Sequence, residues 1–291
     1  MGYLAEAISA ARRARTQGAV PVALWHETTL AEWLVSVPDA FAEQRSHMIA
    51  ALRKRMIGTM EAISADAIDR AMAAMMSVPR ECFIPPLIDD LAYLPMVHDI
   101  GLEQTISHPE MVALLAAAGD PKDGTVLDVG TGSGYQAAVM AGMASHVTSM
   151  EIVKDHARSA RERLTGLGYS NIEVLIGDAG ATGQFPPETF DTIVIAAGAA
   201  TIPEGLKAAL KPGGRLVMPI GRSQDEEQMV LLERLSPDIY RHTLLRPVRF
   251  VPLTGEGMRH NSGTPEEWPA MIASTLPGIT PSSGSEDSLD S

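Results

Sequence analysis

The stretch Val126-Leu-Asp-Val-Gly-Thr-Gly-Ser-Gly-Tyr135 joins a short apolar run to three glycines at alternate positions. An apolar run of this length that is bounded by glycine is typical of a buried strand. Gly130, Gly132 and Gly134 allow the backbone to turn sharply and to approach a ligand without interference from a Cβ atom. The stretch therefore predicts a strand, a ligand-binding turn and a helix, which is a repeating unit of doubly wound α/β sheets.

The spacing of these glycines separates two classes of cofactor. A dinucleotide-binding turn has the spacing G-x-G-x-x-G, which would require glycine at 135, where this chain has Tyr135. The spacing G-x-G-x-G resembles the first motif of S-adenosylmethionine-dependent methyltransferases, whose ligand carries an amino-acid tail in place of a diphosphate. We expect the cofactor-binding residues of this turn to be Asp128, Gly130, Thr131, Gly132 and Gly134.

Acidic residues at the ends of the next two predicted strands sharpen this expectation. Ligands of open α/β sheets bind at the carboxyl ends of the strands. Glu151 can accept from both ribose hydroxyls, and Asp178 can accept from the adenine amino group, with Ile152 and Ala179 beside them. Asp128 has two open interpretations, because it can face the ammonium group of the cofactor or hold the loop through backbone amides.

Short apolar segments alternate with helical patterns between residues 107 and 253. The strands are expected at 126–129, 147–151, 172–176, 192–196, 215–219 and 228–234, and the helices at 109–118, 135–144, 154–167 and 203–210. Such alternation predicts a mostly parallel, doubly wound sheet with helices on both faces. Before it, residues 46–95 carry apolar side chains, many of them methionine, at helical spacing, which predicts a helical cap whose methionines fill the core.

Composition restricts the function. The 291 residues carry a net charge of −13, which argues against a general binder of nucleic-acid backbones. Cys82 is the only cysteine, so the chain can form neither an intrachain disulfide nor a tetrahedral cysteine zinc site. The chain lacks the run of about 18 apolar residues that a membrane span needs. We expect a cytoplasmic monomer without metal, membrane or nucleic-acid partners.

Further segments identify a family. The segment Ile100-Gly-Leu-Glu-Gln-Thr-Ile-Ser-His-Pro109 is similar to the G-x-G-Q-T-I-S-x-P segment of protein-L-isoaspartate O-methyltransferases. The similarity continues through Val78-Pro-Arg-Glu-Cys-Phe-Ile-Pro85 and Leu210-Lys-Pro-Gly-Gly-Arg215, and it ends at Val248-Arg-Phe-Val-Pro-Leu-Thr254. It covers roughly residues 46–254. By this resemblance the fold is that of a class I, Rossmann-like methyltransferase with N-terminal helices.

The resemblance also implies an activity. The enzyme would transfer a methyl group from S-adenosylmethionine to the free carboxylate of L-isoaspartyl residues in damaged proteins, and the ester would then close to a succinimide. Ser107 would be the catalytic residue, orienting that carboxylate. Gln104, Thr105 and Ile106 would contact the cofactor, and the peptide would contact Thr105, Ser107, Val251 and Thr254.

Some features depart from the family pattern or allow another interpretation. Glu103 replaces the usual glycine beside the acceptor site, and Ala179 replaces the glycine after Asp178. Ser107 could instead cap a helix that begins near Pro109. His108 is more simply a solvent-facing neighbour than a catalytic base. Two other functions remain open: methylation of aspartates in a dedicated precursor peptide, and cofactor binding without turnover.

The chain divides into three parts on this basis. Residues 1–45 form an N-terminal extension that begins with an expected helix, residues 46–254 the methyltransferase domain and residues 255–291 a tail that is too rich in Gly, Ser, Pro and acid to order itself. Within the domain, residues 46–106 contain the helical cap and the acceptor segment, and residues 107–254 the Rossmann-like core.

Overall fold

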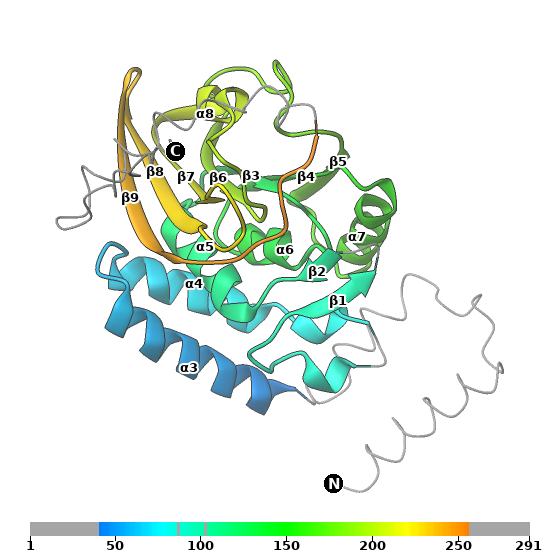
Figure 1. The fold of residues 1–291 in the computed structure, drawn as a ribbon. Helices are drawn as coiled ribbons and strands as arrows, with labels where there is room; N and C mark the ends of the chain where they lie inside the picture. The colour runs from blue at the N-terminus through cyan, green and yellow to red at the C-terminus, as the bar shows by residue number, and fades with distance from the viewer. Residues whose placement is uncertain (1–40, 86–87, 102–103, 256–291) are drawn as a thin grey trace, which may run out of the picture.

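The computed structural model describes residues 41–85, 88–101 and 104–255 (Figure 1). The predicted N-terminal helix, Glu103 and nearly all of the predicted tail lie outside these residues. The first described helix, α3 (Ala42–Thr59), begins inside the segment 1–45 that we assigned to the extension. Arg45 in this helix donates to the hydroxyl of Tyr93 at 2.8 Å, so the end of the extension is already part of the folded domain.

A seven-stranded sheet with the order β5-β4-β3-β6-β7-β8-β9 forms the centre of the domain. The strands are β3 (Thr125–Val129), β4 (His146–Glu151), β5 (Ile172–Ile176), β6 (Phe190–Ile195), β7 (Leu210–Ile220), β8 (Gln228–Ser236) and β9 (Ile239–Pro247). Neighbouring strands are parallel from β5 to β7 and antiparallel from β7 to β9. All six predicted strands are present, and the mostly parallel sheet is confirmed.

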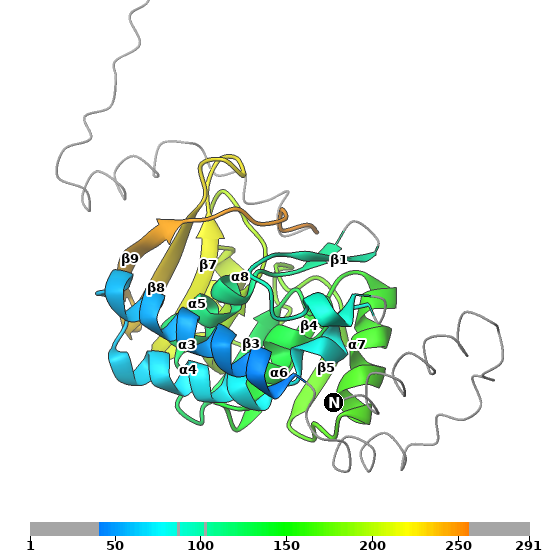
Figure 2. The same cartoon turned by 90° about the horizontal axis from the view of Figure 1, so that it is seen from below.

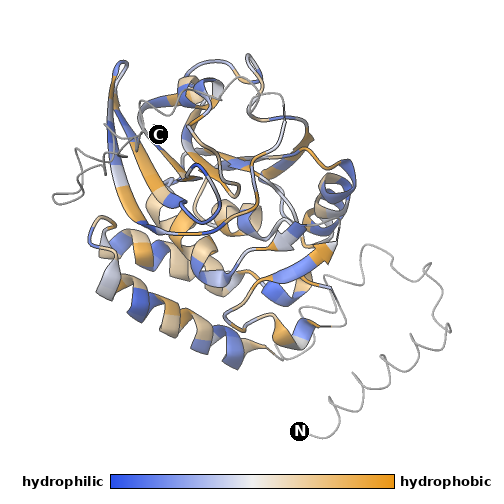
Figure 3. Cartoon of the chain, in the orientation of Figure 1, coloured by the Kyte–Doolittle hydropathy of each residue, from blue (hydrophilic) through white to orange (hydrophobic). Residues whose placement is uncertain are grey.

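Successive side chains of the central strands point to opposite faces of this sheet. Val126 and Val194 belong to one apolar cluster, whereas Leu127 and Ile193 belong to another. The first cluster includes residues of α5 (Pro109–Gly119), α6 (Tyr135–Ala141) and α7 (Lys154–Gly166), and the second includes residues of α8 (Glu204–Ala209). This alternation is the two-residue period of a strand, and the apolar sheet between the more polar helix surfaces is visible in Figure 3.

The helical cap lies outside α5 and α6. Helices α3 and α4 (Ala65–Ser77) pack on each other, and both contact α5 (Figure 2). Ser64 caps α4 by accepting from the amide of Ala67 at 3.3 Å. The methionines are core residues as predicted, since Met48, Met56, Met60, Met72 and Met75 are all buried. Met76, which the same pattern assigned to the core, is 37% exposed.

Three regions differ from the prediction. Strand β9 was not predicted, because its residues are half-buried or exposed and contain no continuous apolar run. The segment before Ser107, where no strand was expected, contains an antiparallel pair of strands, β1 (His98–Gly101) and β2 (Gln104–Ile106). The strand expected at 215–219 already begins at Leu210 as β7, and residues 211–214 form a bulge across which pairing passes from Leu210 to Arg215.

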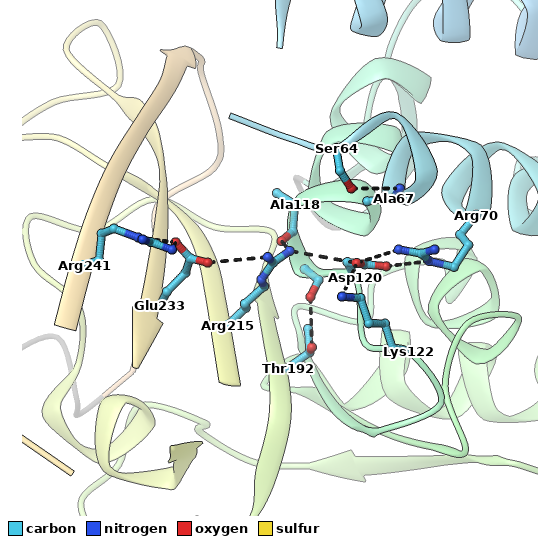
Figure 4. A network of polar contacts seen from close by, with 11 residues as sticks. Ser64, Ala67, Arg70, Ala118, Asp120, Lys122, Thr192, Arg215, Glu233 and Arg241 are labelled. Atoms are coloured by element: carbon cyan, nitrogen blue, oxygen red, sulfur yellow. Dashed lines mark hydrogen bonds and ion pairs between the residues drawn. The ribbon is translucent and has the colours of Figure 1, made fainter. Parts of the chain in front are cut away.

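A polar network joins the cap to the core where α5 ends (Figure 4). The buried carboxylate of Asp120 accepts two hydrogen bonds of 2.8 Å from Arg70 in α4. Arg215 in β7 lies 4.0 Å from the same carboxylate and 3.4 Å from Glu233 in β8. A buried ionised carboxylate is costly unless charged or hydrogen-bonding groups compensate it, so the network fixes the cap against the sheet.

The turn that follows Asp120 is tightly hydrogen-bonded. Lys122 and Asp123 have positive φ angles, and the amide of Gly124 donates to the carbonyl of Pro121 at 2.8 Å. The amide of Asp123 donates to Met143 at 2.9 Å, and the carbonyl of Asp123 accepts from Ser145 at 3.2 Å. These hydrogen bonds fix the position at which the chain enters β3. They therefore also fix the position of the glycine turn, which follows the other end of that strand.

Candidate active site

A cavity of about 350 Å³ lies at the carboxyl ends of β3, β4 and β5. The strip 104–108 and the C-terminal segment 249–254 also line it. Most of the predicted site residues meet here, namely Gln104, Thr105, Ile106, Ser107, Gly130, Thr131, Gly132, Glu151, Ile152, Asp178, Ala179, Val251 and Thr254. Asp128 and Gly134 do not line the cavity.

The glycine turn has the conformation that its sequence predicts. The φ angles of Gly130, Gly132 and Gly134 are +90°, +50° and +90°, a region that other residues rarely adopt. Gly134 precedes α6 and faces α7, where a Cβ atom would lie 3.2 Å from Leu164. Gly130 and Gly132 therefore shape the cavity, whereas Gly134 allows the two helices to pack closely.

Asp128, in β3, supports the glycine turn through side-chain hydrogen bonds. The hydroxyl of Ser149 donates to its Oδ2 at 2.7 Å and lies 2.6 Å from the hydroxyl of Thr131. Asp128 is fully buried, and this burial raises the pKa of its carboxyl to about 7. Of the two interpretations of Asp128, the geometry favours the one in which it holds the loop, although through side chains and not through backbone amides.

Glu151 is the last residue of β4, and Asp178 follows the neighbouring strand β5. The carboxylate of Glu151 accepts from the amides of Gly132 and Val153, both at 2.9 Å, which joins the end of β4 to the glycine turn. Oδ1 of Asp178, after β5, accepts from the amide of Gly180 at 2.9 Å. The backbone of Gly255 passes so close that a Cβ atom there would lie 2.3 Å from Asp178 Oδ2.

These groups suit an S-adenosylmethionine molecule. Two carboxylates at adjacent strand ends are acceptors of the kind that can bind ribose hydroxyls and an adenine amino group, and the glycine turn lines the same cavity. The cavity volume falls within the range of small-molecule sites, about 300–1,000 Å³. The residues present therefore fit this cofactor.

The acceptor side of the cavity begins at β2. Ile106 is buried, while Thr105 is exposed and Ser107 half-buried. The interpretation of Ser107 as a helix cap is wrong, because His108 is the N-cap of α5 and its Nδ1 accepts from the amide of Glu110 at 3.0 Å. His108 is half-buried rather than fully solvent-facing, and burial lowers the pKa of its ring.

The C-terminal segment closes the other side. Gly198, after β6, donates to Val251 at 2.8 Å and accepts from Leu253 at 2.7 Å. The buried carboxylate of Glu227 accepts from the amide of Phe250 at 2.7 Å. Burial raises the pKa of Glu227. Sequence reasoning missed Glu227, because nothing in the local pattern of the β7–β8 connection marks a carboxylate whose partner lies 23 positions away.

Among the described residues, no three or more His, Cys, Asp or Glu side chains are grouped in a way that could hold a metal ion. In the same part of the chain, no helix is long and apolar enough to cross a membrane.

The doubly wound sheet, the G-x-G-x-G turn and the acids after β4 and β5 define a class I, Rossmann-like methyltransferase. The family model for protein-L-isoaspartate(D-aspartate) O-methyltransferase matches residues 44–258. The chain belongs to this family.

Relatives and solved structures agree with this assignment. A protein-L-isoaspartate O-methyltransferase of Rhodopseudomonas palustris is 44% identical over 190 residues, which cover 64% of this chain and 85% of the relative. One of Syntrophobacter fumaroxidans is 41% identical over 221 residues, covering 75% and 88%. A solved protein-L-isoaspartate O-methyltransferase gives a TM-score of 0.60 at 27% identity, covering 74% of this chain and 67% of that one.

A second solved structure supports the fold. It is a Plasmodium falciparum protein described as a protein-L-isoaspartate O-methyltransferase in complex with S-adenosyl-L-homocysteine, with a TM-score of 0.57 at 24% identity. The match covers 70% of this chain and 97% of the other.

Proposed function

We propose that this protein methylates the free carboxylate of L-isoaspartyl residues, which form when asparagine and aspartate residues are damaged. S-Adenosylmethionine is the methyl donor. The ester then closes to a succinimide, which hydrolyses partly to normal aspartate, so that the reaction begins a repair. The observation that carries this proposal is the single cavity in which the strip 104–107 faces the glycine turn and the two acids.

The chemistry requires alignment more than proton transfer. A carboxylate with a pKa near 4 is already ionised at neutral pH, so no strong general base is needed. The bound donor supplies a methyl group on a positively charged sulfur, which a carboxylate oxygen can attack in line. The chain must hold both partners in this geometry and exclude competing water.

Each side of the cavity has a part in this alignment. We assign the cofactor to the turn 130–132, to Glu151 and Ile152, to Asp178 and Ala179, and to the edge of Gln104, Thr105 and Ile106. Asp128 and Gly134 act from outside the cavity, by holding the turn and by packing the helix after it.

Ser107 is the catalytic residue of the proposal, because its hydroxyl can donate to the substrate carboxylate and fix the attacking oxygen. The peptide lies against Thr105, Val251 and Thr254. An extended peptide can pair with exposed main chain, and the edge of the C-terminal segment offers main-chain groups beyond those that bind Gly198. We also propose that the enzyme works as a cytoplasmic monomer without nucleic-acid or membrane partners.

A matched pair of peptides tests the function. The two peptides have one sequence and differ only in whether a single residue is L-isoaspartyl or L-aspartyl. We expect transfer of labelled methyl groups from S-adenosylmethionine to the isoaspartyl peptide alone. Equal labelling of both peptides, or labelling of neither, would contradict the proposal.

A further inference from the structure

One arginine beside the active site is completely buried. Arg80 begins the short 3-10 helix η2 (Arg80–Phe83), and its exposed fraction is 0%. Burying a guanidinium is costly unless its charge and its N–H groups find partners. Arg80 does not line the cavity, so the reason for its burial must lie in what it joins.

The guanidinium joins three segments that are distant in sequence. Its Nε donates to the carbonyl of Ala92 and its Nη2 to the carbonyl of Ser107, both at 2.8 Å. Its central carbon lies 4.7 Å from the centre of the Tyr135 ring, a distance at which a cation is attracted to the face of an aromatic ring. Tyr135 is the first residue of α6 and directly follows the glycine turn.

The Tyr135 ring and the backbone of Arg80 are both held in place by further contacts. The Tyr135 ring is 1% exposed and packs at 63° against Phe83, with 5.5 Å between ring centres. The backbone amide of Arg80 donates to the hydroxyl of Tyr93 at 3.2 Å, and that hydroxyl also bonds to Arg45 and Glu81. Arg80 therefore cannot shift without disturbing the cap.

We propose that Arg80 is a positioning residue that sets the place of the acceptor residue Ser107 relative to the cofactor turn. The inference rests on the proposed function of Ser107. An arginine suits this role because its planar fork can donate in two directions while its face stacks on a ring. A lysine ammonium is a point charge without a planar face, so it cannot make both donations and stack on the ring at the same time.

The chain contains a matched control for this residue. Arg234 in β8 is 7% exposed, donates to the carbonyls of Leu210 and Pro237, and lies over the ring of Tyr240 at 5.9 Å. It is thus also a buried arginine that bonds main-chain carbonyls and lies over a tyrosine ring, and it differs from Arg80 in its ion pair with Glu188 at 2.9 Å. It joins sheet strands instead of the two sides of the cavity, and neither Arg234 nor its partners line the cavity.

The first test compares Arg80→Lys with Arg234→Lys in the full-length enzyme. We expect Arg80→Lys to lower kcat on the isoaspartyl peptide by roughly 10- to 100-fold, because small misplacements of reacting groups are costly. The affinity for S-adenosyl-L-homocysteine, measured by calorimetry, should change little. Arg234→Lys should lower the Tm and leave kcat unchanged. Equal kcat losses in both variants, or a normal kcat in Arg80→Lys, would overturn the proposal.

A double-mutant cycle distinguishes positioning from general support. If Arg80 acts through Ser107, Arg80→Lys should reduce kcat much less in a Ser107→Ala background than in the wild type. Additive losses would show that the two residues act independently and would refute the inference. If Arg80→Lys does not fold, Tyr135→Leu removes the aromatic face instead, and the same cycle with Ser107→Ala then decides.

Hydrogen exchange supplies a readout that does not depend on turnover. Backbone amides in residues 104–112 should exchange faster in Arg80→Lys than in the wild type and should be unchanged in Arg234→Lys. Unchanged exchange in Arg80→Lys contradicts the role of Arg80 even if the enzyme methylates isoaspartyl peptides. A wild type inactive on those peptides contradicts the proposed function, and the exchange measurement then still decides whether Arg80 holds the strip.

Discussion

The two sides of the cavity are built in different ways. The donor side consists of three adjacent strand ends and one glycine turn, within residues 128–179, and its main contacts are backbone amides bonded to Glu151 and Asp178. The acceptor side combines the strip 104–107 with the segment 249–254, which are more than 140 positions apart. Buried charged side chains, Arg80 and Glu227, hold these two pieces.

This difference shows how the two sides should respond to substitution. A site made from neighbouring strand ends inherits its geometry from the sheet, so one lost side chain should remove one contact with the ligand. A site assembled from distant segments depends on the side chains that hold them. We therefore expect substitutions on the donor side to change affinity, and substitutions on the acceptor side to change turnover.

The largest expected effect is that of Ser107→Ala. In our proposal the Ser107 hydroxyl orients the acceptor carboxylate, so its loss should lower kcat on the order of 100-fold, as expected for a misaligned reacting group. The affinity for S-adenosyl-L-homocysteine should stay nearly intact. Steady-state kinetics and calorimetry measure the two quantities. Ser145→Ala, at an exposed serine outside the cavity, is the control. A loss of cofactor affinity in Ser107→Ala would place Ser107 on the donor side. It would contradict the expectation that substitutions on the acceptor side change turnover.

Asp178→Ala should show the converse pattern. If Asp178 accepts from the adenine amino group, as we propose, its removal should weaken cofactor binding by about 1–3 kcal/mol, the usual cost of leaving a buried hydrogen-bonding group unpaired. The kcat at saturating cofactor should remain near that of the wild type. Asp191→Ala is the control, because Asp191 bonds Thr125 and Lys211 at the start of β6, away from the cavity. Unchanged cofactor affinity in Asp178→Ala would remove Asp178 from the site.

The smallest effect concerns the pH dependence of stability. Because burial raises the pKa of Asp128 to about 7, the folded protein keeps a proton that the unfolded chain loses above about pH 4. The wild type should therefore lose stability between about pH 4 and 7 relative to Asp128→Asn, which has no such proton. Thermal unfolding of the unliganded proteins should show the difference in Tm growing in favour of the variant as pH rises.

Asp191→Asn provides a control of opposite sign. Although partial burial works in the other direction, hydrogen bonds from Lys211 and Thr125 lower the pKa of Asp191. The wild-type carboxylate should then stabilise the fold above about pH 4, and this advantage over Asp191→Asn should disappear as pH falls below that value. If the Asp128 variant followed the same trend as the Asp191 variant, the carboxyl of Asp128 would be ionised in the folded protein.

The same contrast explains what the sequence could predict. The glycine turn, Glu151 and Asp178 each follow a short apolar strand, so a local pattern locates them and the parallel sheet brings them together. Strand β9 was missed because it lies at the edge of the sheet and none of its residues is fully buried. Its place depends on pairing with β8 rather than on its own hydrophobicity.

The acceptor side could be predicted only by resemblance. The segment around Ser107 was recognised from a motif, whereas the hairpin that carries it and the cap of α5 at His108 became evident only in the structure. Arg80 and Glu227 were not assigned roles, since an isolated charged residue in a sequence is most often exposed. Their side-chain hydrogen-bond partners lie 12 to 27 positions away, beyond the reach of any helical or strand period.

The turn between α5 and β3 bears on how the protein itself ages. Among aspartyl dipeptides, an Asp-Gly pair such as Asp123-Gly124 rearranges readily to isoaspartate, because the glycine nitrogen can attack the preceding side chain without steric hindrance. Here that nitrogen is engaged by the carbonyl of Pro121, and both backbone groups of Asp123 are hydrogen-bonded to residues 143 and 145. A Cβ atom at position 124 would lie 2.7 Å from Asp191, so glycine cannot simply be replaced. The chain thus contains a dipeptide that is prone to isoaspartate formation, and the hydrogen bonds of the fold restrain the backbone motion with which that reaction would begin.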